Sequence, residues 1–383
     1  MNGIPVSGGR FKVYYRLFGH GSEASALAAA RDIALEQTVE FPEEHIPSEA
    51  IRKNIVGRIE SVTGEGGIFE ATISYAAETA GGQVPQLLNV LFGNSSLKPD
   101  ILLSRIELPE NMPFKGPRFG VEGLRRLLGI PDRPLLCTAI KPLGLNAREL
   151  ADLTYRFALG GIDIIKDDHG LADQPFAPFK ERVELCSAAV AKANKETGGR
   201  SLYFPSITLP FNDFPGMLRF AKQAGAGGFL VSPGIVGFDA MRLIAGNDEL
   251  NLPVLMHPTF LGGFVTHQAG ISHMALFGQL ARIAGADGSI FPNYGGRFAF
   301  SREQCAGIAA GCSMPMGSLK RIFPVPGGGM TLDRVSEMLE LYGRDVIFLI
   351  GGGLFNRGPD VTAAARYFLS LVEKSPQTSS AAK

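Results

Sequence analysis

A cluster of charged residues follows an apolar stretch in the segment GGIDIIKDDHG, residues 160–170. The isoleucines of this segment favour burial in a strand, yet Lys166, Asp167, Asp168 and His169 follow without a break. Burying charged groups without partners is strongly unfavourable. Either the strand emerges into water at this point, or the charges balance each other around something bound between them.

Polar residues also follow the other strands predicted in this part of the chain. Eight short apolar stretches alternate with amphipathic helical segments over residues 119–372, which predicts an α/β fold of the (β/α)8 TIM barrel type. An open, doubly wound sheet is the alternative. Active sites of TIM barrels lie at the C-terminal ends of the strands. The further residues expected at this end are Lys141, Ser232, His257, Asn293 and Arg297.

Two glycine-rich turns follow the last two predicted strands, with GGG at 327–329 and again at 351–353. Glycine lets backbone N–H groups approach an anion closely, and this corner of a TIM barrel commonly binds phosphate. The alternative is that these glycines only serve turns that need a positive φ. The glycines expected to contact a phosphate are Gly327, Gly328, Gly351 and Gly352.

The first part of the chain, residues 1–118, has a different pattern. Its apolar segments predict the order strand, helix, two strands, helix and strand, which is the α+β ferredoxin-like arrangement. A segment rich in proline and glycine, ENMPFKGPRFG, links it to the barrel. A barrel alone would not need this domain, so we expect it to complete a site or an interface. Residues 373–383 are expected to form a disordered tail.

The composition excludes several classes of partner. Lys plus Arg and Asp plus Glu both number 37, so the chain has no net charge, which argues against nucleic acid or a membrane surface as the main partner. No stretch is apolar enough to span a membrane and the start lacks the layout of a signal peptide, which predicts a cytoplasmic protein. The 4 cysteines show no CxxC spacing and are expected to be buried free thiols.

The segment GGIDIIKDDHGLADQPF resembles the RuBisCO superfamily, whose pattern at this strand is GGxDxxKDDE followed by a QPF-type stretch. Further similar segments are NVLFGN at 89–94, RPLLCTAIKPLGL at 133–145, MHPTFLGG at 256–263, PGGGM at 326–330 and LIGGGLF at 349–355. The likeness covers nearly the whole chain and implies the same two-domain fold. Several carboxylase positions differ, so the chain resembles the RuBisCO-like proteins rather than the carboxylase.

The resemblance implies a metal site. Lys166 would take up CO2 as a carbamate and bind Mg²⁺ together with Asp168 and His169. Burial favours the neutral amine that this reaction needs, because it lowers the pKa of a lysine. The carboxylase and enolase members have Glu at the position of His169, and imidazole suits Mn²⁺ or Zn²⁺ better than carboxylate does, so these ions are alternatives to Mg²⁺. An ion pair of Lys166 with the neighbouring aspartates is the alternative without a metal.

The resemblance also assigns other site residues. Lys141 matches a lysine that acts as acid or base near the substrate carbon. Glu36 and Asn89 match residues through which the N-terminal domain reaches into the partner subunit's active site, which implies a homodimer with shared sites. For Glu36, an ordinary solvated helix end is the alternative.

The substrate is expected to have one phosphate. The carboxylase binds a second phosphate with arginine, histidine and serine, where this chain has Pro258, Phe291 and Pro326. None of these three side chains can donate a hydrogen bond. Arg297 stands near the position of the lysine that steadies CO2, and its guanidinium suits a carboxylate or phosphate of the substrate. We therefore expect no carboxylation of ribulose bisphosphate.

These features together predict a metal-dependent enzyme that forms an enolate on a sugar-derived monophosphate. The preferred reaction is decarboxylation of a phosphorylated β-keto acid, 3-oxo-isoapionate 4-phosphate, to a tetrulose phosphate and CO2, as in the enzymes of apiose breakdown. The alternatives are transcarboxylation and hydrolysis of that substrate, an enolase or isomerase of a methylthio-sugar phosphate with an apolar pocket from Pro258, Phe291 and Phe298, and a non-catalytic sugar-phosphate binder. The residues expected to act in catalysis are Lys141, Lys166, Arg297 and Glu36, and those expected to bind substrate are Asn89, His257 and the four glycines named above.

Overall fold

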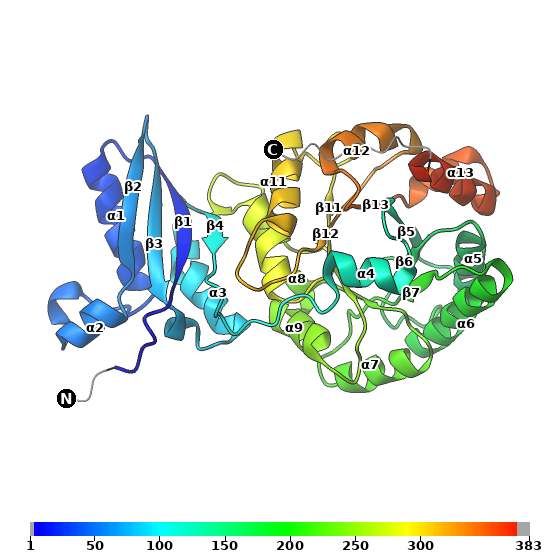
Figure 1. The fold of residues 1–383 in the computed structure, drawn as a ribbon, viewed down its shortest axis with the longest axis horizontal. Coiled ribbons are helices and arrows are strands. Elements are labelled where there is room, and N and C mark those ends of the chain that lie inside the picture. Colours follow the sequence, from blue (N-terminus) through cyan, green and yellow to red (C-terminus); the bar gives the residue numbers. More distant parts are fainter. Residues whose placement is uncertain (1–3, 374–383) are drawn as a thin grey trace.

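The computed structural model describes residues 4–373, which form an N-terminal sheet with its helices and a larger barrel beside it (Figure 1). The N-terminal strands are β1 (Arg10–Phe18), β2 (Arg58–Glu65), β3 (Ile68–Ala76) and β4 (Ile101–Glu107). They lie in the order β4-β1-β3-β2 with antiparallel neighbours. With α1 (Glu23–Glu36) before β2 and α3 (Val84–Phe92) before β4, this confirms the predicted ferredoxin-like arrangement. The short α2 (Glu49–Asn54) precedes β2.

Alternating burial shows that one face of β1 packs into the core of the N-terminal domain. Phe11, Val13, Tyr15 and Leu17 are fully buried, whereas the residues between them are partly or fully exposed. Successive side chains of a strand point to opposite faces, so every second residue enters the core.

A fifth strand ties the sheet to the barrel. β10 (Gly270–Ile271) comes from the barrel half and pairs in parallel with β4. Close to it, the buried side-chain amide of Gln279 accepts a hydrogen bond from the N–H of Ile106 at 2.9 Å and donates one to its carbonyl at 2.6 Å. The edge of the N-terminal sheet is therefore covered by the barrel half, which fixes the two parts side by side.

The barrel strands are all parallel and eight in number. They form two four-stranded sheets, β13-β5-β6-β7 and β12-β11-β9-β8. A parallel bridge between Ser206 and Leu230 joins β7 to β8, and β12 lies beside β13 on the other side, so the strands close into a ring. Their bounds are β5 Leu135–Ile140, β6 Ile164–Asp167, β7 Leu202–Phe204, β8 Phe229–Val231, β9 Val254–Met256, β11 Gly288–Pro292, β12 Phe323–Gly327 and β13 Ile347–Leu349.

Helices surround these strands, as Figure 1 shows, and the predicted TIM barrel preceded by a ferredoxin-like domain is confirmed. Two of the longer helices begin with a capping box, at Asn146 and Ser301, in which the cap side chain and the third helical residue bond each other's backbone N–H. The helices are α4 Gly120–Leu128, α5 Ala147–Leu159, α6 Phe179–Thr197, α7 Phe214–Gln223, α8 Pro233–Val236, α9 Phe238–Gly246, α10 Ala281–Ile283, α11 Arg302–Ser313, α12 Val335–Tyr342 and α13 Val361–Glu373.

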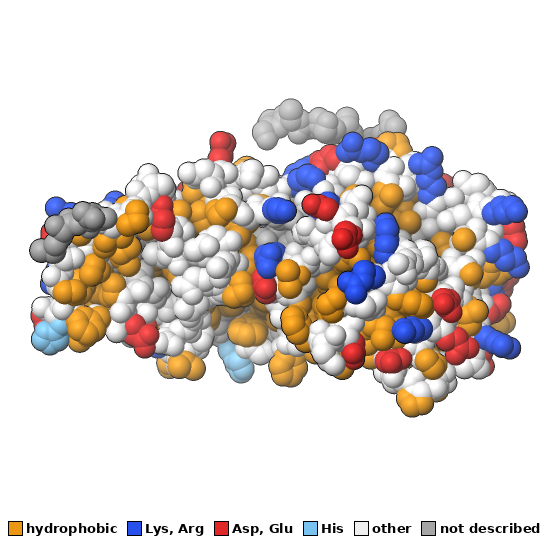
Figure 2. All heavy atoms as spheres, turned by 90° about the horizontal axis from the view of Figure 1, so that it is seen from below, with side chains coloured by type: hydrophobic (Ala, Val, Ile, Leu, Met, Phe, Trp, Pro, Cys, Tyr) orange, Lys and Arg blue, Asp and Glu red, His pale blue; other side chains and the backbone are white. Residues whose placement is uncertain are grey.

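Other expectations concern the surface and the thiols. Lysine, arginine, aspartate and glutamate side chains are interspersed over the barrel half of the face in Figure 2, in keeping with the balanced charge. All 4 cysteines are buried and free, as predicted. No helix within residues 4–373 is long and apolar enough to cross a membrane. The expected tail lies outside the described residues except for Glu373, which ends α13.

The segment after β10 departs from a regular helix. Residues Met274–Leu280 form a π-helix, which continues into α10. Its Gly278 packs directly on Gly311 of α11, where a Cβ on Gly278 would lie 2.7 Å from the Gly311 Cα. The hydrophobic periodicity of the sequence gives no separate signal for such a wider turn.

Replacement of Gly278 with alanine should destabilise the protein, because the added methyl group overlaps backbone atoms of α11. We expect the free energy of unfolding to fall by about 1–3 kcal/mol in denaturant titrations. Gly307→Ala on α11 is the matched control, since its Cβ would lie at an ordinary 3.8 Å from the Met274 Cβ. Equal stability of the two variants would contradict the close packing of these helices.

Candidate active site

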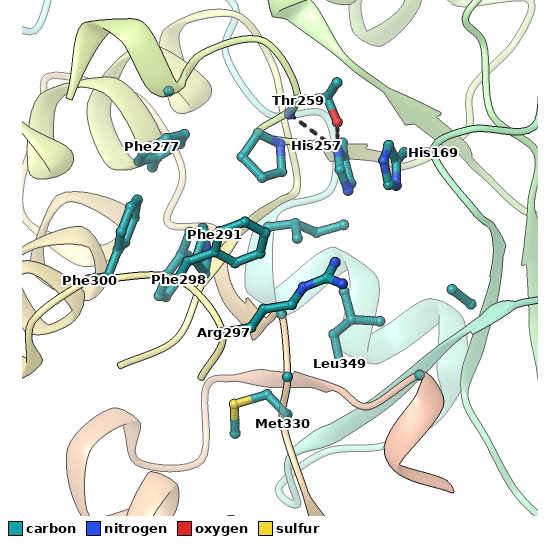
Figure 3. A pocket seen from close by; sticks show the side chains of 18 of the residues that line it. His169, His257, Thr259, Phe277, Phe291, Arg297, Phe298, Phe300, Met330 and Leu349 are labelled. Atoms are coloured by element: carbon teal, nitrogen blue, oxygen red, sulfur yellow. Dashed lines mark hydrogen bonds between the residues drawn. The ribbon is translucent and has the colours of Figure 1, made fainter. Parts of the chain in front are cut away.

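A cavity of about 840 Å³ opens at the C-terminal ends of the barrel strands. Its size is that of a typical small-molecule site. Figure 3 shows His169 and His257 on one side, Arg297 near the middle, and phenylalanines on the other side. The structure thus brings together most of the predicted barrel residues. Those that line the cavity are Lys141, Lys166, Asp168, His169, His257, Arg297, Gly328, Gly351 and Gly352.

The end of β6 resolves the question raised by the charged cluster. Lys166 and Asp168 line the cavity, whereas Asp167 between them points the opposite way, as alternation along a strand requires. Lys166 is 2% exposed, and its Nζ donates a hydrogen bond to the Asp167 carbonyl at 3.1 Å. Burial lowers the pKa of Lys166, which favours the neutral amine.

The Asp167 carboxylate is fully buried and fully bonded. Arg182 of α6, also fully buried, donates to its Oδ2 at 3.1 Å, as does the Ser206 N–H at 3.0 Å. The Tyr203 hydroxyl donates to Oδ1 at 2.6 Å, and burial raises the pKa of Tyr203 well above its usual value. These donors compensate the desolvation of the carboxylate, so Asp167 is a structural anchor rather than a ligand facing the cavity.

Arg182 also holds the loop that follows β6. Its Nη1 and Nη2 donate to the carbonyls of Ala177 and Ala172 at 2.5 and 2.7 Å. One guanidinium therefore joins the strand end to the QPF loop, and through Asp167 to β7. This connection fixes the backbone from which Lys166 and His169 extend.

Asp168 is the centre of the polar side of the cavity. Its Oδ1 lies 3.1 Å from the Lys141 Nζ and 3.1 Å from the His169 Nδ1, and it also accepts the His169 N–H at 3.0 Å. Burial opposes ionisation of Asp168, but the His169 contact and the charges of Lys166 and Lys141 prevail and lower its pKa. With Nδ1 directed at the carboxylate, His169 keeps Nε2 for a ligand.

His257 is held in one tautomer. Its Nδ1 accepts a hydrogen bond from the Thr259 N–H at 3.2 Å and lies 2.6 Å from the Thr259 hydroxyl (Figure 3). Desolvation and then the charge of Lys166 lower the pKa of His257 well below its usual value. The neutral ring therefore carries its proton on Nε2, which faces away from Thr259 and can donate to a bound molecule. The ring stacks on His169, with centroids 4.5 Å apart.

The glycine-rich turns supply unbonded N–H groups. Those of Gly328, Gly329 and Gly351 have no acceptor within residues 4–373. At Gly329, where φ is +98°, a Cβ would lie 2.9 Å from the Arg297 backbone nitrogen, so no larger residue fits there. Gly327 was predicted to contact a phosphate but ends β12 and does not line the cavity; Gly329 and Gly353 line it instead.

The remaining wall is largely apolar. Pro258, Phe291 and Phe298 line the cavity as predicted for an apolar pocket, whereas Pro326 lies in β12 and does not reach it. The Arg297 guanidinium stands 5.0 Å from the centre of the Phe298 ring and donates no hydrogen bond within residues 4–373. It is a cation available to a ligand.

Glu36 and Asn89 are not part of this cavity. They line a separate cavity of about 380 Å³ in the N-terminal domain, where Glu36 accepts a hydrogen bond from Asn94 at 2.9 Å. Within one chain the structure does not bring them to the barrel mouth. Their predicted role therefore depends on a second copy of the chain.

Among the cavity residues that the sequence analysis did not identify are His273, Phe277 and Phe300. These side chains do not follow the predicted barrel strands: His273 directly precedes the π-helix, Phe277 lies within it, and Phe300 precedes α11. Desolvation lowers the pKa of His273 to about 4, so its ring is neutral near pH 7. An isolated histidine at a helix start carries no signal that would have identified it.

The side chains that could hold a divalent cation are Lys166, Asp168 and His169. The Asp168 Oδ2 accepts no hydrogen bond within residues 4–373, and the His169 Nε2 is likewise free of partners there. No three His, Cys, Asp or Glu side chains of the described chain come together as a metal site. A third protein ligand would therefore have to come from Lys166 as a carbamate, and its desolvated amine fits that chemistry.

The sequence and the fold match a known family. The model of the ribulose bisphosphate carboxylase large chain, catalytic domain, matches residues 120–367. The chain belongs to this family. It is 41% identical over 367 residues to the 5-methylthioribulose-1-phosphate isomerase of Rhodospirillum rubrum, with 95% of this chain and 96% of that protein covered. It is 31% identical to the 2,3-diketo-5-methylthiopentyl-1-phosphate enolase of Bacillus pumilus, covering 92% and 90%.

A solved structure supports the same family. The crystal structure of a Rubisco-like protein from Rhodopseudomonas palustris has a TM-score of 0.86 and 40% identity, covering 97% of this chain and 100% of that one. The resemblance to RuBisCO-like proteins is thereby confirmed. The narrower likeness to apiose-pathway enzymes stays a prediction.

Arg182→Met should strongly destabilise this RuBisCO-like protein, because it leaves the Asp167 carboxylate buried without a counter-charge. We expect a loss of about 3–5 kcal/mol in the free energy of unfolding. Adding Asp167→Asn to the Arg182→Met variant should restore part of the lost free energy of unfolding, since no unpaired charge then remains buried. Arg242→Met, at an exposed ion pair with Asp239, is the control and should cost about 1 kcal/mol or less. Equal losses at the two arginines would contradict the anchoring role.

His273 should make folding sensitive to acid. Its pKa is about 4 in the folded protein, against about 6.5 in an unfolded chain, so the unfolded state takes up a proton first as the pH falls. The free energy of unfolding should therefore decline between pH 6.5 and about 4. In urea titrations at several pH values, the free energy of unfolding of the His273→Gln variant should decline less over this range. An identical decline in both proteins would be the contrary result.

Proposed function

We propose that this protein is an isomerase of 5-methylthioribulose 1-phosphate that transfers a proton beside a carbonyl group. The make-up of the cavity wall supports this most. The N–H groups of Gly328, Gly329 and Gly351, together with Arg297, offer a site for one phosphate, while much of the remaining wall is aromatic. A substrate with one phosphate and one apolar end suits such a wall. The 41% identical relative from Rhodospirillum rubrum is named for this substrate.

Lys141 is the best-placed proton carrier. Its side chain is 34% exposed, lines the cavity, and has its Nζ 3.1 Å from Asp168. His257, with its proton on Nε2, can donate a hydrogen bond to a substrate oxygen and so stabilise negative charge there. The aspartate orients the lysine, and Thr259 orients the histidine.

Lys166 as a carbamate, Asp168 and His169 would hold a divalent cation, with Mg²⁺ expected and Mn²⁺ or Zn²⁺ as alternatives. The bound cation would supply positive charge for the oxygen anion that forms when a proton leaves the neighbouring carbon. By the resemblance, Pro258 and Phe291 match positions at which the carboxylase binds a second phosphate, and both line the cavity here, so we propose no carboxylation of ribulose bisphosphate.

Decarboxylation of a phosphorylated β-keto acid is the second candidate. The free guanidinium of Arg297 favours it, because a bidentate cation matches a substrate carboxylate. No relative reported above is named for this reaction. Hydrolytic cleavage of the same compound would use the same residues, and a non-catalytic binder would use only the glycines and Arg297.

We further propose a homodimer with shared active sites. Glu36 and Asn89 lie in a cavity of the N-terminal domain that is separate from the barrel mouth. In a dimer this surface of one subunit could complete the active site of its partner, which gives the N-terminal domain a role that the barrel alone does not supply.

Incubation with 5-methylthioribulose 1-phosphate, Mg²⁺ and bicarbonate in D2O tests the function by NMR. We expect a new isomer with deuterium at the carbon that exchanges its proton. Lys141→Met should lower the rate by about 10²-fold or more, since the proton carrier is lost. The control Lys180→Met, at an exposed position of α6, should leave the rate of isomerisation unchanged. Release of CO2 from 3-oxo-isoapionate 4-phosphate, with no isomerisation of the pentulose, would favour the second candidate instead.

A further inference from the structure

One wall of the cavity is formed by His273, Phe277 and Phe300, which we call the aromatic box. The rings of His273 and Phe300 meet edge to face, with centroids 4.4 Å apart and an angle of 88°. Phe277 lies 6.4 Å from His273 and 6.0 Å from Phe300. Figure 3 shows Phe277 and Phe300 together on the side of the cavity away from His169. The proposed proton transfer uses none of these residues.

The segment that carries His273 and Phe277 is bonded to the N-terminal sheet. His273 directly precedes the π-helix and Phe277 lies within it. Ser272 holds the start of this segment to β4, because its N–H donates to the Leu103 carbonyl at 2.8 Å and its hydroxyl to the Ser104 carbonyl at 2.6 Å. π-Helical turns are rare and are found frequently at functional sites.

The chemistry of the aromatic box is apolar. No Asp, Glu, Lys or Arg belongs to it, and the His273 ring is neutral near pH 7. The two ring nitrogens of His273 have no hydrogen-bond partner within residues 4–373, so the neutral ring is the one polar group of the box, with one donor and one acceptor. Aromatic rings make favourable contacts with thioether sulfur, whereas the Phe277 and Phe300 rings offer a hydroxyl no hydrogen-bond partner in place of its water.

We propose that the aromatic box binds the unphosphorylated end of the substrate and selects an uncharged thioether or alkyl group over a hydroxyl. The inference rests on the proposed function, in which a pentulose monophosphate has its phosphate at the glycine turns. The aromatic box is then the specificity determinant of the site, and His273, Phe277 and Phe300 are not catalytic residues.

A comparison of two substrates tests the selection. The native enzyme should have a kcat/KM for 5-methylthioribulose 1-phosphate at least about 10-fold above that for ribulose 1-phosphate, whose end is a hydroxyl. Phe300→Ala should lower the value for the methylthio compound by about 10-fold or more and that for the hydroxyl compound by less than about 3-fold. Phe300→Leu keeps an apolar side chain, so its kcat/KM for the methylthio compound should lie between the values of the native enzyme and Phe300→Ala. A native preference for the hydroxyl compound, or an equal loss for both compounds, would overturn the proposal.

The matched control is Phe220→Ala, a similarly half-buried phenylalanine on the outer helix α7. It should lower stability without changing the ratio of the two kcat/KM values. A changed ratio in this variant would show that selection does not reside in the aromatic box.

Binding separates this proposal from the proposed function. The probe is 5-methylthioribitol 1-phosphate, which has no carbonyl group and cannot isomerise. Calorimetry should show weaker binding to Phe300→Ala than to the native protein by about 10-fold, and equal binding of ribitol 1-phosphate to both. This result would support selection by the aromatic box even if neither pentulose phosphate were turned over. The lack of turnover would refute only the proposed isomerase activity. Equal binding of the methylthio probe to both proteins would refute the proposed role of the aromatic box in selection.

Discussion

The buried ion pair between Asp167 and Arg182 is the interaction on which the rest of the site depends. Three charged residues in a row cannot all face one cavity from a strand, so the middle one must enter the layer between strands and helices. The desolvation of the two charges offsets much of their mutual attraction, and proteins are often stabilised when such a pair is replaced by apolar residues. The pair therefore contributes orientation more than stability: it directs Lys166 and Asp168 to the barrel mouth and holds the loop that carries His169.

The cavity separates charge from apolar surface. Lys141, Asp168 and the two stacked histidines occupy one side, and phenylalanines occupy the other. Electrostatic interactions are stronger where water is excluded, so an apolar wall next to the charged cluster increases the effect of every fixed charge. The same wall limits the substrates that fit. In the proposed function, residues at the strand ends would transfer the proton, and the aromatic box would select the substrate.

Much of the architecture could be predicted from the sequence, because periodicity reports which face of each element is buried. All eight barrel strands and the βαββαβ order follow from such patterns. Strand β10 and the π-helix could not be predicted in this way. β10 has only the two residues Gly270 and Ile271, and the π-helix packs on α11 through Gly278 and Gly311, a contact between segments separated along the chain.

The sequence by itself determined the residue types available to the site: a lysine, an aspartate and a histidine at the end of one strand, glycines in two turns, and apolar side chains where a second phosphate would bind. Only the tertiary structure decided which of them meet. It turned Asp167 away, placed Gly329 rather than Gly327 at the cavity, and set the tautomer of His257 through Thr259. The physical reason is that local pattern specifies which face is buried, whereas the partner across that face is set by packing between distant segments.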